Sequence, residues 1–245
     1  MNSNDDLLPI RFWWGFKRRD VSRVDFLGKL ASVFLPTTVQ VMSRRLGALT
    51  GYLPIVPADH GCIDVPDELA LVVYRSIAEY EQASGSLEGR AYQLLHDSVF
   101  APPSSSKGFP VRFKGNLESN QPYFLWSQSA DWMGGHSSLL LGRRPAGVSA
   151  EKFAENVTAA LNALAQVSED RKPSTVLVRV SKNCLSYVEL WAGTNIPNGD
   201  CFNTVASTVN TIMSSPAAPV AMPADLNEKS WLHLSDSGEF LNLQF

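Results

Sequence analysis

Three places in the sequence gather histidine, acidic and hydroxyl side chains that could do chemistry. One is the segment that carries Asp131, His136, Ser137 and Ser138, an acid, a base and two hydroxyls, which are the groups that nucleophilic catalysis needs. The pair Gly134-Gly135 inside this segment is equally typical of a turn between two strands, and no strand-to-helix nucleophile elbow accompanies it. The segment therefore gives a candidate hydrolase site, with a plain turn as the simpler interpretation.

The other two places are the neighbouring pairs His96-Asp97 and Asp59-His60. A His-Asp pair is typical of metal-dependent phosphohydrolases, but such a site needs further ligands and the sequence shows no set of them. Asp59-His60 lies among Pro and Gly, where a solvated loop pair or a contact with a partner are the two interpretations. We therefore predict no metal site.

The remaining candidate nucleophiles are cysteines, and their surroundings favour no chemistry. Cys62, Cys184 and Cys201 form neither a CxxC pair nor an even framework, which predicts reduced thiols and no disulfide. No nearby base or cation would lower a thiol pKa at Cys184 or Cys201. The sequence also lacks phosphate-binding, dinucleotide-binding, zinc-binding and calcium-binding motifs, so we expect no cofactor.

The elements that would position these residues begin with helices. We expect a strand over 7–16, a helix with Asp20 as N-cap that Pro36 ends, and an irregular connection over 50–66. Asp64 and Pro66 predict the start of a second helix that runs through Tyr80, and its outer face carries acidic side chains. A further helix is expected over 87–99. The acidic side chains of the second helix are Asp67, Glu68, Glu79 and Glu81.

Beyond an exposed break at 101–108, the hydrophobic period changes to that of strands. Strands over 109–114, 123–127 and 137–141 suit a meander, and Ser149 predicts the cap of a helix that buries Phe153, Val157, Ala160, Leu161 and Leu164. We further expect a hairpin of 175–180 and 185–191, a helix over 202–213, and short strands around 231–234 and 240–243. No sequence repeat is found.

These elements predict an α+β fold, an antiparallel sheet with helices packed on it. Helices concentrate in residues 1–101 and strands, with one long helix, in residues 109–245. The two regions form either one domain or two lobes divided near Pro102. At 245 residues, with 44% hydrophobic content, the chain is long enough for either arrangement.

Charge is segregated along the sequence. Residues 7–45 carry eight Lys or Arg against two acids, a local charge of +6, and residues 59–97 carry eight acids against two Arg, a local charge of −6. One interpretation is that these charges solvate helices and compensate one another. The other is an acidic surface that attracts a basic partner. The net charge of −3 argues against a nucleic-acid binder.

The opening residues lack the basic stretch and apolar core of a signal peptide, and no apolar run is long enough to span a bilayer. We therefore expect a cytoplasmic protein that does not bind membranes.

The stretch Phe12-Trp13-Trp14-Gly15-Phe16-Lys17-Arg18-Arg19 resembles the opening of a family of immunity proteins from bacterial polymorphic-toxin systems. That family begins with a strand that ends in Trp-Gly and a basic residue before the first helix. The Tyr123-Phe-Leu-Trp126 strand and the run from Gly134 to Leu141 are similar in kind to its middle portion. The resemblance covers about half of the chain, and 54–67 and the C-terminal third lie outside it.

The resemblance implies a binding protein rather than an enzyme. Its partner would be a secreted effector with a restriction-endonuclease-like DNase domain, delivered by a type VI secretion system, which it would neutralise. Charge alone then selects the contact residues Asp59, His60, Asp67, Glu68, Glu79 and Glu81, because an acidic surface can occupy a DNA-binding groove. Inhibition away from the nuclease site is an open alternative. So are a hydrolase using Asp131 and His136 and a non-catalytic adaptor.

Overall fold

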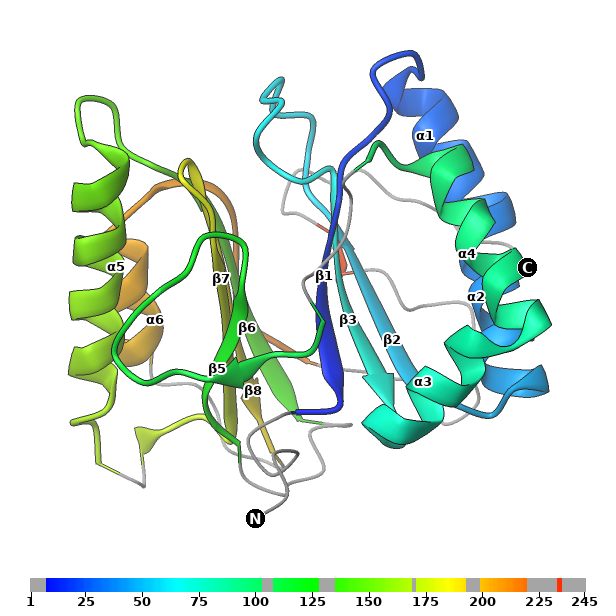
Figure 1. Cartoon of the computed structure of the whole chain (residues 1–245). Coiled ribbons are helices and arrows are strands. Elements are labelled where there is room, and N and C mark those ends of the chain that lie inside the picture. The colour runs from blue at the N-terminus through cyan, green and yellow to red at the C-terminus, as the bar shows by residue number, and fades with distance from the viewer. Residues whose placement is uncertain are drawn as a thin grey trace. The chain divides into compact units, whose positions relative to one another are not determined.

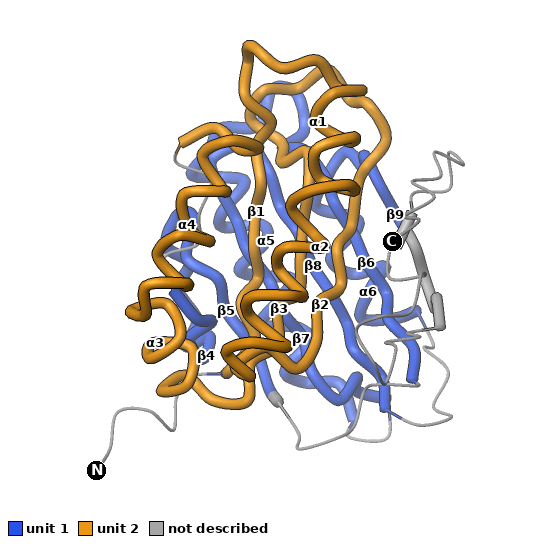
Figure 2. The backbone as a smooth tube through the Cα atoms, turned by 90° about the vertical axis from the view of Figure 1, so that its right-hand side faces the viewer, with its two compact units in different colours: residues 1–8, 106–221 blue, residues 9–105, 222–245 orange. Residues whose placement is uncertain are grey.

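The α+β fold class is confirmed in the computed structural model, which describes residues 8–102, 108–127, 135–168, 171–192, 199–219 and 233–234. The chain forms two compact units, coloured separately in Figure 2. Unit 1 comprises residues 1–8 and 106–221, and unit 2 comprises residues 9–105 and 222–245. Each unit holds its own sheet, so residues 9–105 contain three strands where one, over 7–16, was predicted.

Unit 1 has a six-stranded sheet of order β4-β5-β7-β8-β6-β9. From β6 to β9 the path is strand, helix, strand, strand, helix, strand, with β8 antiparallel to β6 and β7, and β9 antiparallel to β6. This is the ferredoxin-like arrangement, with β4 and β5 added beside β7. Its elements are β4 (Val111–Arg112), β5 (Pro122–Ser127), β6 (His136–Arg143), α5 (Ala150–Leu164), β7 (Thr175–Val180), β8 (Cys184–Trp191), α6 (Asp200–Ala206) and β9 (Asn210–Pro219).

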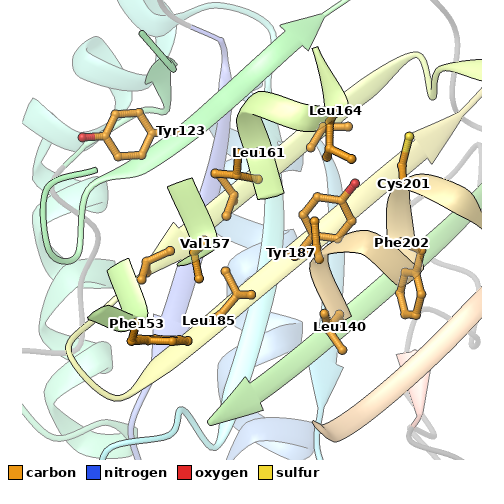
Figure 3. Close-up of a cluster of buried hydrophobic side chains, with 14 residues drawn as sticks. Tyr123, Leu140, Phe153, Val157, Leu161, Leu164, Leu185, Tyr187, Cys201 and Phe202 are labelled. Carbon is orange, nitrogen blue, oxygen red and sulfur yellow. The ribbon is translucent and has the colours of Figure 1, made fainter. Parts of the chain in front are cut away.

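The predicted meander is therefore wrong, because β7 and β8 separate β5 from β6. The predicted helix at 202–213 is also shorter, and the chain from Asn210 is strand. The α5 prediction is confirmed with its Ser149 cap and all five buried apolar residues, and so is the β7–β8 hairpin. Figure 3 shows how α5 and α6 contribute Phe153, Leu161 and Phe202 to a core shared with Leu185 and Tyr187 of β8.

Unit 2 follows the same path as unit 1. Its sheet has the order β1-β3-β2-β10, and the first three strands match the order of β6, β8 and β7. Where a fourth strand would lie, Lys17 and Phe100 form a single antiparallel bridge and the Ala101 N–H donates to the Phe16 carbonyl. The two units thus share one topology, although the sequence shows no repeat. Its elements are β1 (Ile10–Gly15), α1 (Arg23–Lys29), η1 (Leu30–Phe34), α2 (Leu35–Thr38), η2 (Val39–Arg45), β2 (Leu49–Val56), β3 (Glu68–Tyr74), α3 (Ile77–Gly85), α4 (Leu87–Val99) and β10 (His233–Leu234).

The first helix does not end at Pro36 as predicted. It starts after Ser22, not Asp20, and continues to Arg45 through two π-helical segments, η1 and η2. A proline inside a helix lacks an N–H and crowds the carbonyl one turn before it, and the wider π turn of η1 directly before α2 accommodates this. α4 lies beside this helical series in Figure 1, and Phe34 packs on Tyr92 and His96 of α4.

The predicted irregular connection at 50–66 and the second helix are wrong in part. Residues 49–56 form the buried strand β2, and residues 68–74 form β3, so helix begins only at Ile77. The run Leu-Ala-Leu-Val-Val-Tyr of β3 is apolar throughout, a pattern that fits either a buried strand or a helix. Pairing with both β1 and β2 decides for strand.

The predicted helix at 87–99 is confirmed as α4, and the strand near 231–234 is confirmed as β10. The predicted strand at 240–243 lies outside the described residues. No described helix combines the length and the apolar composition that crossing a bilayer requires.

Candidate functional site

The loop pair Asp59-His60 braces its own loop. Asp59 is exposed and its carboxylate accepts the Gly61 N–H. His60 Nδ1 accepts the Cys62 N–H at 3.1 Å, which leaves its proton on Nε2, 3.3 Å from the Pro66 carbonyl oxygen. Asp59 is therefore available to a partner, whereas the His60 ring is held by the loop.

The predicted acidic helix face does not exist. Asp67 directly precedes β3 and accepts the Lys17 N–H at 2.8 Å, and Glu68 is the first residue of β3 and is fully buried. On α3, Glu79 is half-buried and Glu81 is exposed. Glu68 cannot contact a partner, because the strand turns its side chain into the helix–sheet interface.

Instead, parts of the basic and acidic regions compensate each other. Arg45 of η2 binds Glu88 of α4 at 2.8 Å, which joins the basic region to the acidic one. The Arg18 guanidinium pairs with Asp20 of its own region and donates to the backbone carbonyl of Asp97. The Arg18 guanidinium holds the pKa of Asp20 down at about 2. Solvation and compensation, the first of the two charge interpretations, explain these contacts without a basic partner.

The predicted hydrolase segment is not a loop where the structure describes it. Asp131 lies outside the described residues, and His136, Ser137 and Ser138 are consecutive residues of β6. Successive side chains of a strand point to opposite faces, so Ser137 lies on the other face from His136 and Ser138. The described part of the segment therefore does not bring a histidine and both serines together.

Ser138 instead adjoins a buried carboxyl that sequence reasoning missed. Glu189 lies opposite Ser138 in the β6–β8 register and is fully buried. Its Oε1 accepts the Tyr187 hydroxyl at 2.9 Å and its Oε2 accepts the Trp191 indole N–H at 3.1 Å. Burial raises the pKa of Glu189, and these two bonds and Ser138 act against that rise. The alternation Tyr-x-Glu-x-Trp could have revealed this cluster, because it places all three on one face.

Unit 2 buries a second carboxyl, Glu68, between its sheet and its helices. Glu68 Oε1 accepts the Tyr52 hydroxyl at 3.0 Å, whereas Oε2 has no hydrogen-bond partner among the described residues. The Trp13 indole N–H lies near enough to lower the Glu68 pKa, yet it too forms no hydrogen bond there. Burial is the largest effect and raises the pKa of Glu68 to about 8.

His96 belongs to this same interface and not to a metal dyad. Its ring packs on Trp13 and Phe34 with centroids 5.3 and 4.8 Å away, and burial lowers its pKa to about 4. Asp97 points to solvent, and no cluster of three or more His, Cys, Asp or Glu able to hold a metal occurs within the described ranges.

The Cys201 thiol is not activated. All three are free, and Cys184 and Cys201 are buried. Burial and the neighbouring Glu189 raise the pKa of Cys201 to about 11, which keeps it protonated at neutral pH.

Exposed apolar side chains distinguish the two units. Every large hydrophobic side chain that is exposed within the described ranges belongs to unit 2. Two of them, Leu87 and Leu94, lie on α4 with 74% and 71% of their surface exposed, and the exposed Ala91 lies between them. Because residues three, four and seven apart share one side of a helix, these three side chains form an apolar stripe on α4. The other exposed members are Val24, Val33 and Ile63.

No protein-family model and no curated protein matches the chain. Two similar solved structures are a "putative monooxygenase" from Lactobacillus acidophilus NCFM and an anthrone oxidase-like protein. The first has 9% identity and a TM-score of 0.32, covering 87% of this chain and 96% of its own. The second has 13% identity and a TM-score of 0.34, covering 88% and 95%.

The names of these two structures contradict the expectation that the chain is not an enzyme, and we withdraw it. At these TM-scores the likeness supports no argument about a reaction.

Proposed function

We propose that this chain is an immunity protein that binds and neutralises a cognate nuclease effector through the apolar stripe of α4. The observation that carries the proposal is the exposure of Leu87 and Leu94 on one helix face, in a chain whose other unit exposes no large hydrophobic side chain among the described residues. A few well-packed and fully buried side chains supply most of the free energy of protein–protein binding. An exposed pair on one helix face suits that role.

The opposite side of α4 is held firmly, which favours docking on a preformed surface. The hydroxyls of Tyr92 and Thr38 hydrogen bond at 2.7 Å, and Tyr92 stacks on Phe34. At the start of the helix, the Ser86 hydroxyl accepts the Gly89 N–H and donates to the Ala83 carbonyl. A helix fixed in this way loses little conformational entropy when a partner covers its outer face.

The choice of an effector as the partner that binds the α4 stripe rests on the resemblance of the opening strand to immunity proteins. Charge adds a smaller contribution than the sequence suggests, because several acids are already engaged. Glu81 on α3, Asp97 on α4 and Asp59 in its loop are the exposed acids that a basic nuclease surface would meet. The apolar stripe therefore supplies affinity in this proposal, and these acids supply orientation and a faster association.

The test is co-purification of the tagged chain with the product of its adjacent gene, followed by a DNA-cleavage assay of that product with and without the chain. We expect a stable complex and loss of cleavage. Leu87→Glu with Leu94→Glu should weaken binding by about 30-fold or more and restore cleavage, since such anchors contribute about 2 kcal/mol or more.

The matched control is Ala159→Glu with Ala163→Glu on α5 of unit 1, which adds the same charges to an exposed helix face. These variants should bind as the wild type does. Circular dichroism of all variants separates lost binding from lost folding. No complex with the adjacent product, or equal weakening by the α4 and α5 variants, contradicts the proposal.

A further inference from the structure

Three buried polar atoms of the sheet–helix layer of unit 2 have no hydrogen-bond partners among the described residues: Glu68 Oε2, Trp13 Nε1 and His96 Nδ1. Glu68 and Trp13 belong to β3 and β1, and His96 belongs to the helix that packs above them. Buried polar groups are nearly always paired, so a group of unpaired atoms needs an explanation. Tyr52, through its bond to Glu68 Oε1, satisfies only one side of the carboxyl.

Trp13 connects this carboxyl to α4. Its ring makes edge contacts with His96 and with Phe100, at centroid distances of 5.3 and 5.6 Å. The layer is tightly filled, because a Cβ added at Gly15 would lie 2.4 Å from the Phe100 ring and 2.9 Å from Trp13 Nε1. Any rotation of the Trp13 indole therefore moves its contacts with the C-terminal end of α4.

We propose that Glu68 is a proton-controlled latch, in which the neutral carboxyl leaves Trp13 packed on α4 and the carboxylate draws the Trp13 indole N–H to itself and loosens α4. An ionised carboxylate has two acceptor oxygens and no donor, so in the buried layer it needs a second donor besides the Tyr52 hydroxyl. Trp13 is placed to supply it, because Gly15 lies opposite Glu68 in the β1–β3 register and Trp13, two residues earlier on β1, shares that face. The Trp13 indole N–H has no hydrogen-bond partner among the described residues.

Tyr52, Tyr74, Tyr92 and His96 keep their charge while Glu68 titrates. Burial raises the pKa of Tyr52, Tyr74 and Tyr92, and it lowers the pKa of His96 to about 4. The Glu68 pKa of about 8 places the latch in weakly alkaline solution. The titratable and charged groups that face the layer are Arg11 from β1, Tyr52 from β2, Tyr74 from β3, Tyr80 from α3, and Tyr92 and His96 from α4.

The test follows the indole N–H resonance of Trp13 in the full chain by ¹⁵N-correlated NMR between pH 6.5 and 9.5, with Trp13→Phe as the assignment variant. We expect this resonance to move downfield with a midpoint near pH 8, as a hydrogen bond to a carboxylate forms. Backbone resonances of His96 and Phe100 should shift with the same midpoint. In Trp13→Phe, the α4 resonances should lose most of that shift, because the connection is gone.

Glu68→Gln should abolish the titration, whereas the control Glu81→Gln on α3 should leave it unchanged. If Glu68→Gln does not fold, Tyr52→Phe serves instead. It removes a bond that lowers the Glu68 pKa, so the midpoint should move to higher pH. A Trp13 resonance that stays still over this range, or titrates equally in Glu68→Gln, overturns the latch. Neither result depends on whether α4 binds a toxin.

Discussion

The two units differ in how hydrogen bonds satisfy a buried glutamate. Each buries a glutamate near a tyrosine hydroxyl and a tryptophan indole N–H, but only Glu189 of unit 1 is bonded to both. Its donors, Tyr187 and Trp191, are the residues two before and two after it on the same strand. Glu68 takes its hydroxyl donor from β2 and has its indole on β1.

This difference shows why one buried carboxyl has donors on both oxygens and the other has a donor on only one. Donors on the same strand are placed by the two-residue period of the backbone, so the Glu189 cluster is complete once β8 forms. Donors on neighbouring strands depend on register and on packing by helices. For Glu68 the second donor would be Trp13 of β1, whose ring packs on His96 and Phe100.

The largest expected effect is a gain of stability on Glu68→Gln. A carboxyl whose pKa rises from 4.5 unfolded to about 8 folded binds its proton more tightly in the folded state. The free energy of unfolding then falls as pH rises from 4.5 to 8 and is constant above that range. Removing the titration should stabilise the protein by about 4 kcal/mol at pH 7.5, measured by urea denaturation. A loss of stability at that pH would contradict the neutral, adjustable carboxyl.

The matched change Glu189→Gln should have the opposite sign. An amide has one acceptor oxygen, so either the Tyr187 hydroxyl or the Trp191 N–H would face an NH₂ group. A buried donor left without an acceptor costs about 2 kcal/mol, and the same urea experiment should show that loss. If the two Gln variants change stability alike, the contrast between the two carboxyls fails.

His96 should make the free energy of unfolding depend on pH below 6.5. Its pKa falls from 6.5 to about 4 on folding, so the unfolded chain binds the proton more tightly. The free energy of unfolding therefore falls as pH drops from 6.5 to 4, by about 1.4 kcal/mol per pH unit.

Between pH 4.5 and 6.5 this dependence opposes that of Glu68, and the wild type should be nearly flat there. Glu68→Gln should reveal the His96 slope, and His96→Phe should reveal the Glu68 slope. Equal slopes in both variants would contradict the assignment.

The elements of unit 1 were more predictable from sequence than those of unit 2, for a physical reason. The Ser149 cap and the apolar spacing of α5 are local signals, and the β7–β8 hairpin alternates as hairpins do. β3 has no local signal to separate it from a helix, because both of its faces are buried. Its identity comes from pairing with β1, which is far away in sequence.

The same reason explains which site residues were missed. Glu68 was selected for its charge, as part of an exposed face, but a charge count does not detect burial. Leu87 and Leu94 fit the expected helix at 87–99, yet their spacing alone does not say which side of that helix meets the core. The aromatic contacts of Tyr92 and His96 with Phe34 decide this.

The smallest expected effects on stability come from the N-cap serines of α5 in unit 1 and α4 in unit 2. Ser149 caps α5 through one bond, to the Lys152 N–H at 3.1 Å, and Ser149→Ala should cost about 1 kcal/mol. Ser86 caps α4 through the Gly89 N–H at 2.9 Å and also donates to the Ala83 carbonyl at 2.6 Å. Ser86→Ala should therefore cost about 1.5 kcal/mol, since it also leaves that carbonyl without its hydroxyl donor.

Hydrogen exchange resolved by peptide distinguishes these cap losses from a general loosening. Ser86→Ala should speed exchange in the first turn of α4 and leave α5 unchanged, and Ser149→Ala should do the reverse. If α4 is the preformed surface on which a partner docks, the Ser86 variant should also weaken binding, because the partner must then order the helix start. Faster exchange in α4 with unchanged affinity would mean that the stripe binds without needing a fixed first turn, and would leave Leu94 as the more important anchor.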